Sequence, residues 1–221
     1  DIGVSPKLIY SNNKLIVFDF VQGKTLNERD VQENVIELVK LIKKFHTGIP
    51  KKLKGGSQIF WVFHVIRHYS NFLINNESKY KKILKDLLIK SEKIEKQSAP
   101  FDIVYAHNDL LSANFIKKNK KFYLVDWEYA GYNTPLFDLG GLSSNNNFDK
   151  KQEKIMLENY FESKVSNILM HKFNSIKAAS LLRETMWSMV AEIISKIDFD
   201  YKSYTEQNLQ NFYEAYKNLK S

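Results

Sequence analysis

The most informative segment reads His107-Asn108-Asp109-Leu110-Leu111-Ser112-Ala113-Asn114, and Asp126-Trp127-Glu128 follow twelve residues beyond Asn114. Phosphoryl transfer to a hydroxyl needs a carboxylate that orients the hydroxyl and accepts its proton, and oxygen ligands that hold Mg²⁺ against the phosphates. A loop that carries Asp109 and Asn114, followed by a hairpin that ends at Asp126, supplies one base and two magnesium ligands. A single Asp-x4-Asn is common in surface loops, where both residues cap turns. The complete set, flanked by short apolar strands, rarely arises by chance.

Protein kinases carry a similar arrangement, H-R-D-x-x-x-x-N followed by D-F-G. In this chain Asn108 replaces the Arg, and Asp126-Trp127-Glu128 replaces D-F-G. The Arg of protein kinases typically pairs with a phosphate on the activation loop, and no segment that ends in A-P-E follows here. These differences indicate a substrate other than a protein.

The chain around this segment predicts an α-rich α+β lobe. Short strands are expected at 103–105, 114–117 and 122–126, and the last two should form a hairpin around Lys117-Lys118-Asn119-Lys120. Residues 14–21 read as a buried strand. Apolar residues recur at helical spacing after Asn27, a candidate N-cap, at Val31, Val35, Leu38, Val39, Ile42 and Phe45. Further helices are expected at 58–74 and 79–97, and three more from Asp149 to near Leu219. This order differs from the repeating βαβ of a doubly wound sheet.

Composition narrows the class of protein. The 221 residues are 43% hydrophobic, enough for one core or a large lobe with a short appendage. No apolar run approaches the roughly 20 residues that span a bilayer, so we expect no membrane insertion. Cysteine is absent, which excludes disulfides and suits a cytoplasmic location. The net charge of +8 comes from lysines scattered among acidic residues, so we expect no nucleic-acid partner.

The segment from His107 to Leu139 resembles the choline/ethanolamine kinase family, which has a protein-kinase-like fold and belongs to a wider group with the aminoglycoside phosphotransferases. The choline kinase version of this segment is closer than the aminoglycoside phosphotransferase version to the run Asp126-Trp127-Glu128-Tyr129-Ala130-Gly131-Tyr132, with Pro135 and Asp138-Leu139 after it. Residues 15–26 resemble the last strand of the nucleotide lobe and the hinge. The resemblance implies that residues 1–22 end the nucleotide-binding lobe and residues 23–221 form the helical catalytic and substrate-binding lobe. It also implies that backbone groups near Asp19 and Val21 bind the adenine of ATP.

The same resemblance assigns roles in the central segment. Asp109 is the base that receives the hydroxyl proton, and Asn114 and Asp126 ligate Mg²⁺. His107 and Asp138 are expected to brace the loop. For His46, His64, His68 and His171 we expect surface or helix-end positions without a role in the site.

A quaternary ammonium cannot donate hydrogen bonds, so its site relies on aromatic faces and carboxylates. The resemblance suggests Trp187 and Tyr204 as walls of such a cage, with Tyr129 as a third candidate. Glu128 would add negative charge or have a structural role. The alternative for Trp187 is an ordinary core position, because its neighbours Leu182, Met186, Met189, Val190 and Ile193 lie at core spacing. Choline kinases often carry a second Trp one turn earlier, where this chain has Glu184, and a more acidic pocket would also suit ethanolamine.

We therefore expect a kinase that uses Mg²⁺ and ATP to phosphorylate choline or ethanolamine. The alternatives are an aminoglycoside or other small-metabolite phosphotransferase, and a catalytically inactive relative that binds an amine. No Gly-rich loop precedes residue 15, and Lys7 is the only lysine before the expected strand at 14–21. Most of the N-terminal lobe is thus expected to be missing from this chain, which alone should bind ATP weakly and turn over little. The sequence does not predict the oligomeric state.

Overall fold

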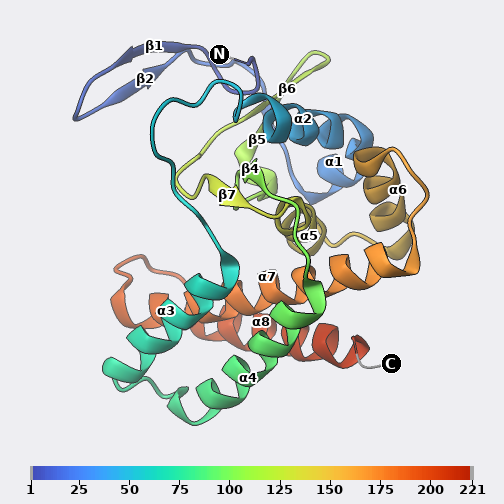
Figure 1. The fold of residues 1–221 in the computed structure, drawn as a ribbon. Helices are drawn as coiled ribbons and strands as arrows, with labels where there is room; N and C mark the ends of the chain where they lie inside the picture. Colours follow the sequence, from blue (N-terminus) through green and yellow to red (C-terminus); the bar gives the residue numbers. More distant parts are fainter. Residues whose placement is uncertain (1, 220–221) are drawn as a thin grey trace.

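The computed structural model describes residues 2–219, in which helices pack beside two small antiparallel sheets and a third small sheet projects from the body (Figure 1). The strands are β1 (Leu8–Ser11), β2 (Ile16–Phe18), β3 (Lys24–Thr25), β4 (Val104–Ala106), β5 (Phe115–Lys118), β6 (Lys121–Leu124) and β7 (Gly131–Asn133). The helices are α1 (Glu28–Glu33), α2 (Val35–Gly48), α3 (Val62–Asn75), α4 (Lys81–Ser98), α5 (Pro135–Asn145), α6 (Lys150–Phe161), α7 (Asn167–Ile194) and α8 (Tyr201–Asn218). This is the expected α-rich α+β class.

The prediction of a buried strand at 14–21 is wrong in part. Strand β2 covers Ile16–Phe18 and pairs with β1, but its three side chains are 62%, 42% and 51% exposed. The hairpin projects from the body as an arm, on which no other described element packs (Figure 1). An apolar run predicts a strand from its composition, but burial depends on a covering element that the run itself does not contain.

Helix α1 begins after the predicted N-cap Asn27, but the helical run expected from there is divided at Asn34 into α1 and α2. The side chain of Asn27 accepts a hydrogen bond from the amide of Asp30, and the carboxylate of Asp30 accepts one from the amide of Asn27, a complete capping box. The apolar residues that follow at helical spacing are all buried, including Val31, Leu38 and Phe45. Helix α2 thereby presents one apolar side to the core beneath the small sheets.

The strands that flank the central loop form two separate sheets. Strands β5 and β6 form the predicted hairpin, with Phe115 opposite Leu124, and β3 extends this sheet along β5. Strand β4 pairs with β7, so that Ala106 lies opposite Gly131. A Cβ atom on Gly131 would lie 2.9 Å from the carbonyl oxygen of Gln58, so only glycine lets this backbone pass so close. Both sheets end beside the loop 107–114.

The helices of the lower layer pack around α7, which contacts α3, α4, α5 and α8 (Figure 1). The three C-terminal helices α6, α7 and α8 were predicted, whereas α5 was not. Helix α5 is buried on nearly every side, so it lacks the polar face that reveals an amphipathic helix. Its Gly140 and Gly141 also lower the intrinsic helix propensity. Gly140 has a packing role, because a Cβ atom there would lie 3.0 Å from the Cα of Lys177 on α7.

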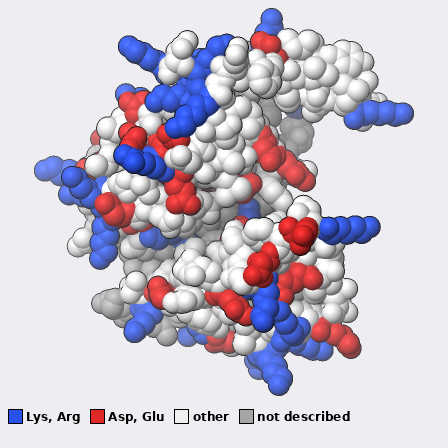
Figure 2. Space-filling model, turned by 180° about the vertical axis from the view of Figure 1, so that it is seen from behind, with Lys and Arg blue, Asp and Glu red and all other residues white. Residues whose placement is uncertain are grey.

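Basic and acidic side chains are interspersed over the face in Figure 2, without one continuous basic surface, and the arm at the upper right is largely uncharged. Within residues 2–219, no helix is long and apolar enough to cross a membrane.

Candidate active site

The loop after β4 is held in place by one buried carboxylate. Asp138, in the first turn of α5, accepts hydrogen bonds from the backbone amides of His107 (2.8 Å) and Asn108 (2.7 Å). Asn108 has a φ of 67°, an uncommon conformation for a residue other than glycine. Its side chain donates to the carbonyl of Tyr129 and accepts from Asn133. These contacts fix the backbone immediately before Asp109.

The network around Asp138 extends to His46 and Tyr160. One ring nitrogen of His46 lies 2.9 Å from Asp138, and the other lies 2.7 Å from the hydroxyl of Tyr160. Burial alone would raise the pKa of Asp138, but the hydrogen bond from His46 and those from the loop outweigh it and lower the pKa. His46 lies at the end of α2, one of the two kinds of position expected for it, but it is not on the surface, because it is buried against the loop's anchor.

Asp109 is a largely buried carboxyl with further charged groups around it. Its side chain is 17% exposed. Burial raises its pKa from 3.8 to about 6, Glu184 and Asp126 add to this rise, and the charge of Arg183 opposes it. A carboxyl with a pKa near the working pH is ionised when it receives a proton, yet is basic enough to attract one.

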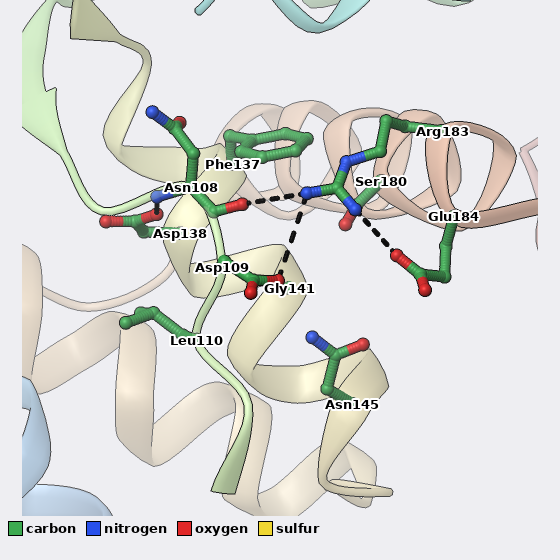
Figure 3. A pocket seen from close by; sticks show the side chains of 10 residues that line it. All are labelled: Asn108, Asp109, Leu110, Phe137, Asp138, Gly141, Asn145, Ser180, Arg183 and Glu184. Atoms are coloured by element: carbon green, nitrogen blue, oxygen red, sulfur yellow. Dashed lines mark hydrogen bonds and ion pairs between the residues drawn. The ribbon is translucent and has the colours of Figure 1, made fainter. Parts of the chain in front are cut away.

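Arg183 and Glu184 complete the immediate surroundings of Asp109 (Figure 3). The guanidinium of Arg183 donates to the carbonyl of Asn108 at 3.1 Å, lies 3.9 Å from a carboxylate oxygen of Asp109 and donates to Glu184 at 2.7 Å. Glu184 also accepts a hydrogen bond of 2.8 Å from the hydroxyl of Tyr204. A buried cation thus bridges the two carboxylates.

The two candidate magnesium ligands follow from the packing of the β5–β6 hairpin. The side-chain NH₂ of Asn114 donates to the carbonyl of Asp109 at 2.9 Å, which leaves its amide oxygen as the donor atom for a metal. The carbonyl of Asn114 accepts from the amide of Val125 at 3.0 Å, and Asp126 comes next with an exposed carboxylate. Burial lowers the pKa of His107, so its neutral ring donates from Nε2 to the carbonyl of Val125 at 2.9 Å.

The aromatic residues come together only in part. Tyr129 lies beside Arg183, whose guanidinium carbon is 5.4 Å from its ring centre and whose charge opposes the rise that burial causes in the Tyr129 pKa. Trp187 is half-buried and its ring meets Tyr201 edge-on at 6.1 Å. Tyr204 reaches the site through Glu184.

Three other predicted residues lie elsewhere. Glu128 is exposed and lines a separate surface pocket with Tyr105 and Trp127. Asp19 and Val21 follow β2 at the base of the arm, where the amide of Asp19 donates to the carbonyl of Lys7 at 2.8 Å.

Sequence reasoning missed Arg183, Phe60 and Tyr69. Arg183 lies 5.7 Å from the ring centre of Phe60, and its charge opposes the rise that burial causes in the Tyr69 pKa. One available signal was the adjacent charged pair Arg183-Glu184 within an otherwise apolar part of α7. Phe60 and Tyr69 carry no such signal, because aromatic residues at these spacings are ordinary core candidates.

Comparison with known proteins gives a consistent picture. A family model described as choline/ethanolamine kinase matches residues 1–154. A protein of Mycoplasma capricolum, named as a LicA homologue, is 32% identical over 177 residues, which are 78% of this chain and 68% of that protein. A LicA homologue of Metamycoplasma hominis is 29% identical over 209 residues, 93% of this chain and 78% of the relative.

Among solved structures, the choline kinase LicA from Streptococcus pneumoniae superposes with a TM-score of 0.82. The alignment covers 98% of this chain and 76% of that structure, at 22% identity. At this identity the comparison shows the fold alone. The central loop, the β5–β6 hairpin and the helical layer described above therefore belong to a fold that a choline kinase also adopts.

Proposed function

The chain belongs to the choline/ethanolamine kinase family, and on this premise we propose that it transfers the γ-phosphate of ATP to the hydroxyl of choline or ethanolamine. The observation that carries the proposal is Asp109, a largely buried carboxyl with a pKa of about 6 in a braced loop, with Asn114 and Asp126 in the same part of the structure. The family match supports the reaction type, and the arrangement of these three residues supports the assignment of roles.

Asp109 acts as the base in this proposal. Its carboxylate orients the alcohol hydroxyl toward the phosphate and accepts the proton as the oxygen attacks. Asp138 and Asn108 act indirectly, since their hydrogen bonds fix the backbone from which Asp109 projects. Little covalent chemistry is left for the protein, because phosphoryl transfer is catalysed mainly by positioning and by neutralising charge.

The residues present fit a magnesium ion. An amide oxygen from Asn114 and a carboxylate from Asp126 are hard oxygen donors, which Mg²⁺ prefers, and Mg²⁺ is commonly held by one or two carboxylates together with phosphates and waters. Among residues 2–219 no group of three or more His, Asp or Glu side chains is placed to hold a metal by itself. A site that needs the nucleotide to complete it is consistent with both facts. When bound, the ion would neutralise charge on the phosphates during transfer.

We further propose that residues 1–22 belong to the nucleotide-binding lobe and residues 23–221 to the catalytic lobe. The arm supports this division, since its two short strands project from the helical body and expose apolar side chains. In this proposal, backbone groups near Asp19 and Val21 bind the adenine edge.

The test is phosphate transfer from Mg-ATP to choline, to ethanolamine and to kanamycin, followed by product analysis. Asp109→Asn should abolish transfer to the amino alcohol, whereas Asp86→Asn, at an exposed carboxylate paired with Lys90 on α4, should leave it unchanged. Transfer to kanamycin alone would favour an aminoglycoside kinase. Binding of an amine without transfer to any of the three would favour an inactive relative.

A further inference from the structure

We propose that Glu184 accepts a hydrogen bond from the ammonium group of the substrate, so that the site selects amino alcohols with at least one N–H over quaternary ones. This inference rests on the proposed function and names the substrate class within it. It assigns a specificity role to the Arg183–Glu184 pair on α7, which lies beside the base (Figure 3).

The first argument is that a protein cation already lies close to the aromatic faces near Asp109. The guanidinium of Arg183 lies 5.4 Å from the ring centre of Tyr129 and 5.7 Å from that of Phe60. Both distances are within the range of a cation–π contact. A quaternary ammonium depends on such faces, because it has no hydrogen to donate. With Arg183 beside these two rings, less aromatic surface is left for a second cation.

The second argument is that Glu184 offers a fixed acceptor in place of the missing faces. One carboxylate oxygen receives the guanidinium of Arg183 at 2.7 Å, and the other receives the hydroxyl of Tyr204 at 2.8 Å. A carboxylate has about four lone-pair positions, so each oxygen can accept one more hydrogen bond. The side chain is 18% exposed and lines the same pocket as Asp109.

The separation of Asp109 and Glu184 suits a two-carbon amino alcohol. A single guanidinium spans the distance between Asp109 and Glu184, in contact with Glu184 and 3.9 Å from Asp109. An amino alcohol with two carbons between its oxygen and nitrogen spans a comparable distance when it is hydrogen-bonded at both ends. Its hydroxyl would then meet the base while its ammonium meets Glu184.

The charges also fit one small cation. Arg183 offsets one of the two carboxylates, so the cluster of Arg183, Glu184 and ionised Asp109 has one negative charge in excess. A substrate ammonium balances it. A hydrogen bond between two charged groups is roughly twice as strong as a neutral one, and only an N–H ammonium can form it with Glu184. A trimethylammonium in the same place would leave the carboxylate partly desolvated without a donor.

The experiment measures kcat/KM for a graded series: ethanolamine, its N-methyl and N,N-dimethyl derivatives, and choline. Successive methyl groups change size evenly, but the last N–H disappears only at choline. The wild-type protein should therefore show its largest fall, about tenfold or more, between the dimethyl compound and choline. Glu184→Gln should reduce this step severalfold, chiefly by slowing the three N–H substrates.

Glu192→Gln is the matched control. Glu192 lies on the same helix and also binds a basic side chain and a tyrosine hydroxyl, those of Lys79 and Tyr80, but it does not line the pocket of Asp109. This variant should keep the wild-type step. A preference for choline, an even decline across the series, or an equal loss for all four substrates in Glu184→Gln would overturn the inference.

Calorimetric binding of the same four amines keeps the inference separate from the proposed reaction. If no substrate is phosphorylated, the proposed function fails, but a step in Kd that depends on Glu184 would still support the inference. Equal Kd values for the dimethyl compound and choline in the wild-type protein would refute it, whatever the turnover.

Discussion

Replacing Arg183 by Gln should move the acid limb of the pH–rate profile to higher pH. Arg183 lies 3.9 Å from Asp109, and its positive charge lowers a pKa that burial and neighbouring carboxylates raise to about 6. Without that charge, the carboxyl takes up its proton at a higher pH. Because the proposed base must be ionised, kcat/KM should begin to fall at a correspondingly higher pH. Gln keeps a donor for the carbonyl of Asn108, so the change chiefly removes charge.

The size of the shift can be bounded from the distance. At 3.9 Å, two unit charges attract by about 1 kcal/mol in water and about 4 kcal/mol at an effective dielectric constant of about 20. These limits correspond to about 0.8 and about 3 pH units. Glu184 contacts Arg183 more closely than Asp109 does and partly neutralises it. We therefore expect a shift of about one unit, toward the lower limit.

The assay is kcat/KM for the amino alcohol from pH 5 to pH 9 at saturating Mg-ATP, so that titration of the nucleotide affects wild type and variant alike. Arg67→Gln serves as the control, because Arg67 pairs with Glu95 on the surface, away from the pocket of Asp109. It should leave the limb in place. A limb that stays at the wild-type pH in Arg183→Gln would show that the titrating group is not Asp109, or that it does not sense Arg183.

Three further predictions concern the loop and the hairpin. Asp109→Asn should raise the free energy of unfolding by about 1–3 kcal/mol above pH 6 and leave it unchanged below pH 4, because a native pKa raised from 3.8 to about 6 makes ionisation of the carboxyl costly in the folded protein. Urea denaturation of both proteins at pH 4 and pH 7.5 measures this difference. Equal stability of the two proteins at pH 7.5 would contradict the prediction. Asp126→Asn should reduce kcat/KM at least about 100-fold and raise the Mg²⁺ concentration needed for the half-maximal rate. Asparagine tolerates the backbone φ of 62° at this position, so the change chiefly removes the carboxylate. An unchanged Mg²⁺ dependence would refute the proposed ligand role. Asp138→Asn should destabilise the fold by about 3 kcal/mol or more, since the NH₂ of the new amide side chain would face a backbone N–H of His107 or Asn108. An unchanged denaturation midpoint would refute the bracing role.

Much of the fold could be predicted from the sequence where local signals agree with tertiary burial. The candidate N-cap Asn27 and the apolar spacing after it were enough to predict a helical segment there, though not its division into α1 and α2, and the turn between β5 and β6 was enough to predict the hairpin. The burial of the strand in the arm was predicted wrongly, because its apolar residues predict a strand but do not show whether another element covers it. Helix α5 failed for the opposite reason, since burial on every side removes the periodicity that reveals a helix.

The candidate site shows a similar limit. The grouping of Asp109, Asn114 and Asp126 was predictable because the three residues are close in sequence and lie around one hairpin. The charged pair Arg183-Glu184 marks an unusual place in α7, but the contact of Arg183 with the loop was not predictable, because it joins residues 75 positions apart through the packing of α5 against α7. His46 was missed for the same reason, since its partner Asp138 is 92 residues away.

The carboxylate of Asp138 connects the loop that carries the proposed base, Asp109, with the proposed metal ligand Asp126. Asn108 and Asp126 both have positive φ values, 67° and 62°, which are uncommon outside glycine, and each lies in a loop that carries a proposed functional oxygen. Asp138 holds the amides of His107 and Asn108, and His107 in turn holds the carbonyl of Val125, next to Asp126. A change at Asp138 should therefore disturb the proposed base and the proposed metal ligand together. A change at Tyr160, which reaches Asp138 only through His46, should disturb both to a smaller extent.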